Sequence, residues 1–305
     1  MLLHHILVPL DGAKDSELAI PVAAFLAARA GARVTLLHVL EAQPPQTVHG
    51  QRHLADERQA QDYLAHLAQA AFGPSVKVTI HVHTPAVQKL APSLELHAAE
   101  LQADLVIMCA HGRIRLRDRL FGNLAQRILA SQTCPVLAVD PGRQAATPAT
   151  PPFQRILVPL DGSLEHESAI APAAVLAELC GASLELVTVV RTVGSLKNGQ
   201  AASAVYLPAA ASEEVRIEET QASQYLGQMA QQLVSKGLTV TTRIDLGDPA
   251  RRIPAIARSQ KADLVVLASH GRAGSEAFWA GSVGAKLLRR TQASLLMVPA
   301  AKSPG

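Results

Sequence analysis

The chain has 305 residues, of which 49% are apolar and 17% charged, and its formal net charge is +3. This balance is typical of a globular protein of about two domains and excludes intrinsic disorder. Aromatic residues make up only 3%, so the chain lacks a platform on which single-stranded bases would stack, and we expect no nucleic acid partner. No stretch reaches the roughly 18 apolar residues of a membrane span, and the start has no signal-peptide pattern. Cys109, Cys134 and Cys180 form no CxxC pair and are expected to be buried thiols, which suits a cytoplasmic protein with no membrane partner.

Apolar strands and amphipathic helices alternate through the first half of the chain. Strands are expected at 3–10, 34–39, 76–82, 104–110 and 134–140, and helices at 15–30, 54–72, 86–101 and 122–131. Gly31 is expected to end the first helix in the left-handed conformation. Tyr63, Leu64 and Leu67 recur at helical spacing and define the apolar face of the second helix.

The second half of the chain repeats this pattern. HILVPLDGAKDSELAI at 5–20 returns as RILVPLDGSLEHESAI at 155–170, and 103–113 returns at 262–272. The offset grows from 150 (155 minus 5) to 159 (262 minus 103), so the second copy has nine extra residues, which we place in 191–211. A Pro-rich segment separates the copies. The sequence therefore predicts a domain at 1–141, a linker at 142–152 and a second domain at 153–300.

The strands are almost continuous runs of Val, Ile and Leu. Such strands, separated by helices, indicate a parallel sheet that is covered on both faces. Right-handed crossovers then make each half a doubly wound α/β domain. We expect two tandem, Rossmann-like domains with five parallel strands each.

The residues that the two copies share best lie where the predicted strands end. They are the pairs Asp11 and Asp161, Val39 and Val189, and His111-Gly112 and His270-Gly271. Ligands of open α/β sheets bind beyond the carboxyl ends of the strands. Shared residues at this rim therefore indicate a ligand site, although Asp11 and Asp161 also have the chemistry of helix caps.

The second copy carries the pattern expected of a phosphate site. Ala268-Ser269-His270-Gly271 is followed, after nine residues, by Gly281-Ser282 at the start of a predicted helix. Glycines allow backbone N–H groups to approach a ligand, and a helix N-terminus attracts anions. The simpler alternative is that Ser282 only caps the helix. A dinucleotide GxGxxG pattern after the first strand is absent, as is a GxxxxGK[ST] loop.

With these motifs, both halves resemble domains of the universal stress protein family, and the pair resembles a tandem universal stress protein. The family's ATP signature is GxxG, nine residues, then G(S/T). The resemblance implies a sheet order of 3-2-1-4-5, pairing of the domains through the fifth strand, and a homodimer. It also implies that the bound nucleotide is ATP, either alone or with Mg²⁺. AMP and ADP are the alternative nucleotides. The nucleotide-binding residues that we predict for the second copy are Pro159, Asp161, Val189, Gly247, Ala268, His270, Gly271, Gly281 and Ser282, and those for the first copy are Asp11, Val39, Gly112, Gly122 and Asn123.

Within that resemblance, Asp161 contacts ribose or adenine and Val189 meets adenine through its backbone. Gly271, Gly281 and Ser282 hold phosphates. Gly247-Asp248-Pro249, which resembles the family's GxP, lines the pocket. The segment 191–211 is expected to be a lid that orders over the adenine.

The first copy departs from the family signature at three positions. Cys109 replaces the first Gly, Asn123 replaces Ser or Thr, and His83-Thr84-Pro85 replaces GxP. We therefore expect the second copy to be the tighter site. Arg113, Arg115, Arg117 and Arg119 of the first copy are either a solvated basic loop or a substitute for the lost phosphate contacts. Thr84-Pro85 and Asp248-Pro249 are each expected to be the N-cap and N1 residues of the third helix.

Other histidines offer alternatives. His81 and His83 alternate on one strand face and suit a metal, but the sequence offers no third ligand, so we predict a polar strand face and no metal. His111 and His270 have no Ser or Asp partner at the spacing of a nucleophilic triad, so we assign no catalytic residue. The predicted function is an ATP-binding stress-response regulator that acts through nucleotide-dependent conformation or assembly. The alternatives are a slow ATPase or self-phosphorylating enzyme and a nucleotide-free interaction scaffold.

Overall fold

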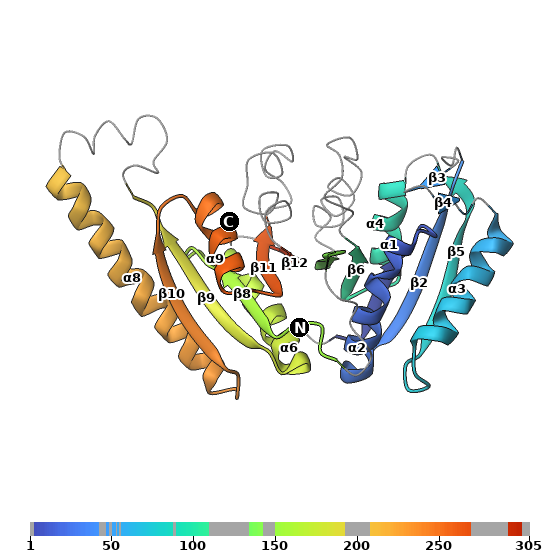
Figure 1. Cartoon of the computed structure of the whole chain (residues 1–305), viewed down its shortest axis with the longest axis horizontal. Helices are drawn as coiled ribbons and strands as arrows, with labels where there is room; N and C mark the ends of the chain where they lie inside the picture. Colours follow the sequence, from blue (N-terminus) through green and yellow to red (C-terminus); the bar gives the residue numbers. More distant parts are fainter. Residues whose placement is uncertain are drawn as a thin grey trace. The chain divides into compact units, whose positions relative to one another are not determined.

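The computed structural model of the chain describes residues 3–42, 47–48, 51–52, 54, 56–87, 90–109, 134–142, 150–192, 208–269 and 292–300. Contacts divide the chain into two units (Figure 1). Unit 1 contains the residues up to Pro152 together with Ser294–Pro299, and unit 2 begins at Phe153.

Unit 1 is built on a parallel sheet. Its elements are β1 (His5–Pro9), α1 (Lys14–Glu17), α2 (Ala19–Ala30), β2 (Arg33–Glu41), β3 (Thr47–Val48), β4 (Gln51–Arg52), α3 (Glu57–Ala71), β5 (Val78–Val87), α4 (Leu90–Glu100), β6 (Leu105–Cys109), β7 (Val136–Val139) and β12 (Ser294–Pro299). The parallel strands follow the order β5-β2-β1-β6-β7. Counted along the chain, this is the order 3-2-1-4-5 that the family resemblance implied, and that prediction is confirmed. β12 lies antiparallel to β7, with Met297 opposite Val136.

Unit 2 repeats the arrangement. Its elements are β8 (Arg155–Pro159), η1 (His166–Ala169), α6 (Ile170–Cys180), β9 (Ser183–Val190), α8 (Pro208–Val234), β10 (Val240–Leu246), α9 (Pro249–Ser259) and β11 (Leu264–Ser269). Within this unit the parallel order is β10-β9-β8-β11. The first four strands of the second copy therefore take the same places as their counterparts in the first copy.

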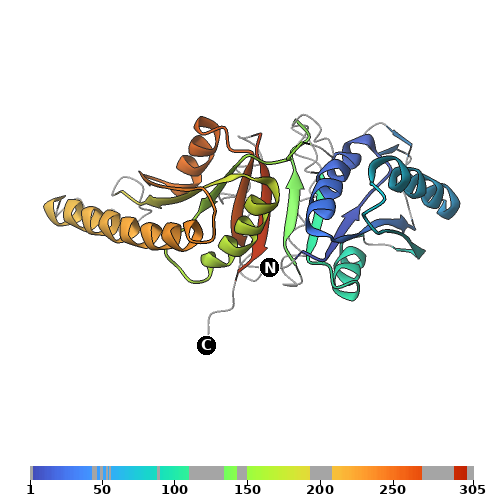
Figure 2. The same cartoon turned by 90° about the horizontal axis from the view of Figure 1, so that it is seen from below.

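Helices cover both faces of each sheet. In unit 2, α6 and α8 lie on one face and α9 on the other (Figure 2). In unit 1, α2 and α3 share a face and α4 lies on the opposite one. Because both faces are covered, the inner strands have apolar residues at nearly every position, and all five residues of β6 are buried, whereas the edge strand β10 has none buried. The doubly wound α/β prediction is confirmed for both copies.

Two helices end at the glycines where the local sequence predicts a helix end. Gly31 ends α2 in the left-handed conformation with φ +66°, as predicted, and Gly181 ends α6 in the same way.

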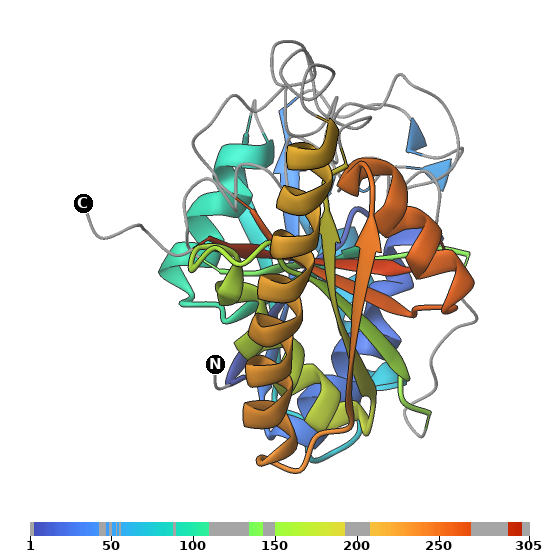
Figure 3. The ribbon, with the colours of Figure 1, turned by 90° about the vertical axis from the view of Figure 1, so that its left-hand side faces the viewer.

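The second long helix differs in length between the two copies. α8 has 27 residues whereas its counterpart α3 has 15. Figure 3 shows α8 along its length. Residues 208–211 of the predicted lid segment therefore begin a helix, and 193–207 of that segment lie outside the described residues.

The expected start of the third helix is wrong in the first copy. Strand β5 continues through Val87, where it pairs with Glu41, and α4 begins only at Leu90. Pro85 therefore lies within a strand and not at N1 of a helix. In the second copy the prediction holds, because Asp248 accepts a hydrogen bond from the N–H of Ala250 (3.1 Å) and Pro249 is the first helical residue. In the second copy β10 ends at Leu246, and Gly247 follows it with a φ of +127°, whereas β5 of the first copy continues through Val87.

The three cysteines are free and buried, as expected. Burial, followed by the negative charges of Asp15, Asp140 and Asp11, raises the pKa of Cys109 to about 12. That thiol is therefore neutral and a poor nucleophile at neutral pH.

None of the helices that the structure describes combines the length and the apolar character needed to cross a membrane.

Candidate nucleotide site at the carboxyl edge of the sheet

The parallel strands of unit 2 bring four predicted site residues to one edge. Pro159 ends β8 and lies opposite Val187 of β9. Val189 lies near the end of β9, and Ala268 is the penultimate residue of β11. The N–H of Gly247, just after β10, donates to the carbonyl oxygen of Val190 (2.9 Å). Because ligands of open α/β sheets bind at this edge, the geometry suits the predicted role.

The residues predicted around the phosphates lie outside the described part of the chain. In the second copy these are His270, Gly271, Gly281 and Ser282, and in the first copy Gly112, Gly122 and Asn123, together with His111 and the four arginines of 113–119. Their roles stay predictions. The structure therefore bears on the adenine and ribose side of the predicted site and not on its phosphate side.

Asp161 follows β8 directly and has a defined orientation. Its Oδ1 accepts hydrogen bonds from the N–H of Ser163 (3.0 Å) and from the Ser163 hydroxyl (2.7 Å). The Nδ1 of His166 lies 2.7 Å from the same oxygen. No donor among the described residues is bonded to Oδ2. One oxygen of the carboxylate is thus held by the protein, and the other is available as an acceptor at the edge where the strands end.

The charges of Asp161 and His166 support each other. Partial burial raises the pKa of Asp161, but the hydrogen bonds from His166 and Ser163 outweigh it and hold this pKa well below its usual range. The hydrogen bond to Asp161 is also the main reason why the pKa of His166 is raised above 6.5. At neutral pH the carboxylate is therefore ionised, and a proton on His166 strengthens its orientation.

We expect replacement of His166 with glutamine to have a pH-dependent effect on stability. A group whose pKa is raised on folding contributes stability that is fully present below its unfolded pKa of about 6.5, and this stability is lost as pH rises through the folded pKa. Since the Asp161 side chain is 58% exposed, the contribution is about 0.5–1 kcal/mol. The loss of unfolding free energy, measured by urea denaturation, should be larger at pH 6 than at pH 9. An equal loss at both pH values would contradict the assignment.

Neither Ser163 nor His166 was identified from the sequence, although a signal for them exists. At the repeat offset of 150 they correspond to Ala13 and Ser16. In the first copy Asp11 Oδ1 accepts a hydrogen bond from the N–H of Ala13 (2.9 Å). The position equivalent to His166 is Ser16, so this copy has no histidine there. The sequence therefore carries the signal as a difference between the two copies, whereas the predicted site residues are those that the copies share.

A buried side chain supports the loop that carries the aspartate in each copy. Thr188 donates its hydroxyl hydrogen to the carbonyl oxygen of Leu160 (3.0 Å). At the equivalent position His38 donates from Nδ1 to the carbonyl oxygen of Leu10 (2.8 Å). These bonds hold the residue just before Asp161 or Asp11. Sequence reasoning missed both side chains because they lie inside apolar strands.

The equivalent edge of unit 1 is crowded beside its aspartate. A Cβ atom on Gly12, next to Asp11, would lie only 2.7 Å from the side chain of Leu54, whereas no described atom lies within 4 Å of the corresponding point at Gly162. Val39 is buried, with 4% of its surface exposed, and it lies opposite His83 of β5. Cys109, at the end of β6, is buried as well. Leu54 and Cys109 thus place apolar side chains at this edge of unit 1.

Comparisons with known proteins agree with this architecture. The model of the "Universal stress protein family" matches residues 3–140 and again residues 152–299. A universal stress protein of Synechocystis sp. is 31% identical over 86 residues, which are 28% of this chain and 56% of that protein. The chain therefore aligns with only about half the length of this curated relative.

Solved structures show the same fold over nearly the whole chain. A universal stress protein from Archaeoglobus fulgidus matches with a TM-score of 0.68 at 18% identity, covering 98% of this chain and 97% of that one. A structure described as a putative universal stress protein, from Pseudomonas aeruginosa, matches with a TM-score of 0.62 at 18% identity and covers 97% and 93%. With the family model matching almost every residue in two consecutive segments, this chain belongs to the universal stress protein family and carries two of its domains in tandem.

Proposed function

We propose that the chain binds ATP at the carboxyl edge of the unit 2 sheet and regulates a stress response through the resulting change in conformation or assembly. The observation that carries this proposal is the geometry of Asp161. Three donors hold Oδ1, and Oδ2 has no partner among the described residues. An ionised acceptor with a fixed orientation suits the hydroxyls of a ribose or the amino group of adenine.

The other residues of this edge fit the shape of a nucleotide. Val189 is partly exposed beside Asp161 and offers its backbone to adenine. Gly247 adds no side chain at the rim, and the N-terminus of α9 follows it directly. Gly271, Gly281 and Ser282 are proposed to hold the phosphates, with Mg²⁺ as their counterion, and ADP or AMP would occupy part of the same site. Ala268, with a single methyl group, stands where the family signature has its first Gly.

We propose that the first domain, 1–141, binds nucleotide weakly or not at all, and that the second, 153–300, carries the functional site. The contact of Leu54 with the Gly12 position supports this difference. We also propose that the domains pair through their fifth strands and that the chain forms a homodimer in the cytoplasm. The antiparallel pairing of β12 with β7 supports the first of these proposals.

The proposal is tested on the full chain. Native mass spectrometry of the purified protein should detect retained ATP, ADP or AMP, and calorimetry with ATP should show one tight binding event per chain. Release of phosphate over hours would identify a slow hydrolase in place of a passive binder. Absence of any nucleotide, bound or titrated, would support a scaffold and overturn the proposal.

A further inference from the structure

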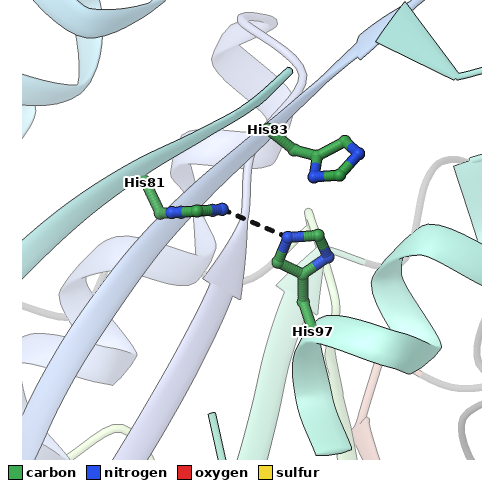
Figure 4. Close-up of side chains that lie close together, drawn as sticks. All are labelled: His81, His83 and His97. Carbon is green, nitrogen blue, oxygen red and sulfur yellow. Dashed lines mark hydrogen bonds between the residues drawn. The ribbon is translucent and has the colours of Figure 1, made fainter. Parts of the chain in front are cut away.

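Three histidine side chains converge in unit 1. His81 and His83 lie two residues apart on β5, so they point to the same face of the sheet. His97 comes from α4, which covers that face. Figure 4 shows the three rings directed toward one another. One nitrogen from each ring lies within 4.8 Å of the others, and the Nε2 atoms of His81 and His97 are 3.1 Å apart.

The tautomer of His97 follows from its second hydrogen bond. Its Nδ1 lies 2.6 Å from the carbonyl oxygen of Ser93, one turn earlier on α4. A carbonyl oxygen only accepts, so Nδ1 carries the hydrogen and Nε2 of a neutral ring has a free lone pair. That lone pair faces His81 and His83. A histidine that ligates a metal commonly donates its other N–H to a backbone carbonyl in this way, which fixes the ring.

The surroundings of the other two rings disfavour a positive charge. Burial, followed by the proximity of His97, lowers the pKa of both His81 and His83, and the Glu100 carboxylate acts in the opposite direction. His97 itself is buried, with 5% of its surface exposed.

Hydrogen bonding alone explains only part of this cluster. His81 can donate from Nε2 to the lone pair of His97, which accounts for the 3.1 Å separation. His83 forms no hydrogen bond with any described residue, yet its ring centroid lies 4.7 Å from that of His97 at an interplanar angle of 86°. A metal ion accounts for all three rings. Tetrahedral zinc with Zn–N bonds of about 2.0–2.1 Å requires nitrogens about 3.3 Å apart, so small ring rotations complete the site.

We propose that His81, His83 and His97 bind a divalent transition metal, with Zn²⁺ as the natural occupant and the fourth position open to water or an external ligand. Imidazole nitrogen is a preferred ligand of zinc, copper, iron and nickel, whereas Mg²⁺ and Ca²⁺ prefer oxygen ligands. The metal ties the edge strand β5 to α4. In the strand register His83 lies opposite Val39, and the second copy has Asp245 opposite Val189, so this histidine ligand belongs to the first copy alone. This site does not depend on the proposed ATP function.

The test uses the full chain without a histidine tag. Titration with Co²⁺ should produce the visible absorption of a tetrahedral site at one ion per chain, and Zn²⁺ should displace it and raise the melting temperature. His81→Gln, His83→Gln and His97→Gln should each weaken Zn²⁺ binding at least about a hundredfold, since each removes a direct ligand, and loss of even an outer partner costs 10–100-fold. The matched control is His66→Gln, an exposed histidine on α3, which should bind as the wild type does.

The buried position of His97 makes its variant sensitive to unfolding, so circular dichroism is recorded for each protein. His81 and His83 are partly exposed, and their variants decide the question even if the His97 variant does not fold. Metal binding should also weaken in acid, because protons compete with the metal ion for imidazole nitrogen. Failure of the wild type to bind Co²⁺ or Zn²⁺, or equal binding by the His66 variant and the His81 and His83 variants, would overturn the proposal.

Discussion

Replacing Asp161 with alanine is expected to lower the affinity of the full chain for ATP by roughly ten- to a hundredfold. A hydrogen bond to a charged group contributes about 1.5–3 kcal/mol, and 1.4 kcal/mol corresponds to about a tenfold change in the dissociation constant. The carboxylate is held through Oδ1 by Ser163 and His166, so it meets a ligand with its orientation already set. Calorimetry of wild-type and variant chains measures the effect.

Asp11→Ala is the matched control, because Asp11 holds the same position in the first copy. It removes an equivalent carboxylate from the edge that Leu54 crowds, so the tight binding event should remain unchanged. Both variants should keep the wild-type circular dichroism spectrum, since Asp161 is exposed and Asp11 lies in a loop. If the Asp11 variant loses the tight event and the Asp161 variant keeps it, the two copies have been assigned the wrong way round.

Gly247→Ala is expected to destabilise the protein by about 1–3 kcal/mol, the cost of a backbone conformation that residues other than glycine rarely adopt. The φ of Gly247 is +127°, and a Cβ atom would lie 3.3 Å from Cγ of Arg252. The strain falls at the point where β10 ends and Asp248 begins α9. Thermal and urea unfolding of the full chain would measure it, and a reduced ATP affinity is expected at the same rim.

The control for this change is Gly227→Ala in the middle of α8. Among the residues that the structure describes, no atom lies within 4 Å of the Cβ that would be added there, and the backbone is helical. Alanine in a helix is favoured over glycine by about 0.5–1 kcal/mol, so this variant should be more stable than the wild type. Two glycine-to-alanine changes in one unit should thus have opposite signs. Stabilisation by both would mean that the backbone at Gly247 relaxes readily.

The two copies share one frame and differ at the edges of their sheets. The frame is the same in both, down to the side chain that holds the carbonyl before the aspartate, Thr188 in one copy and His38 in the other. The edges of the sheets differ. In the second copy Asp161 gains a histidine partner, and in the first copy the edge strand gains the histidines that we propose as metal ligands.

The sequence alone determined the duplication and the α/β class of this protein. Recurrence of sixteen residues at an offset of 150 needs no tertiary information. The alternation of apolar strands with helices is also local, since each period of 2 or 3.6 residues is set by the backbone of one element. Gly31 as a helix end and Asp248-Pro249 as a helix start were predicted for the same reason. The sheet order came from the family resemblance, because no local pattern states which strands are neighbours.

Only the tertiary structure decided which side chains meet. His97 was not a candidate ligand in the sequence, because it lies 14 residues from His83 (97 minus 83) and meets it only when α4 packs back over β5. Leu54 reaches Gly12 across 42 residues (54 minus 12) in the same way. Thr84-Pro85 failed as a helix start because the pairing of β5 with β2 continues to Val87, and that register outweighs a local capping signal. Such contacts depend on strand register and helix packing, which bring together segments that are distant in sequence. No local sequence pattern indicates which of these segments will meet.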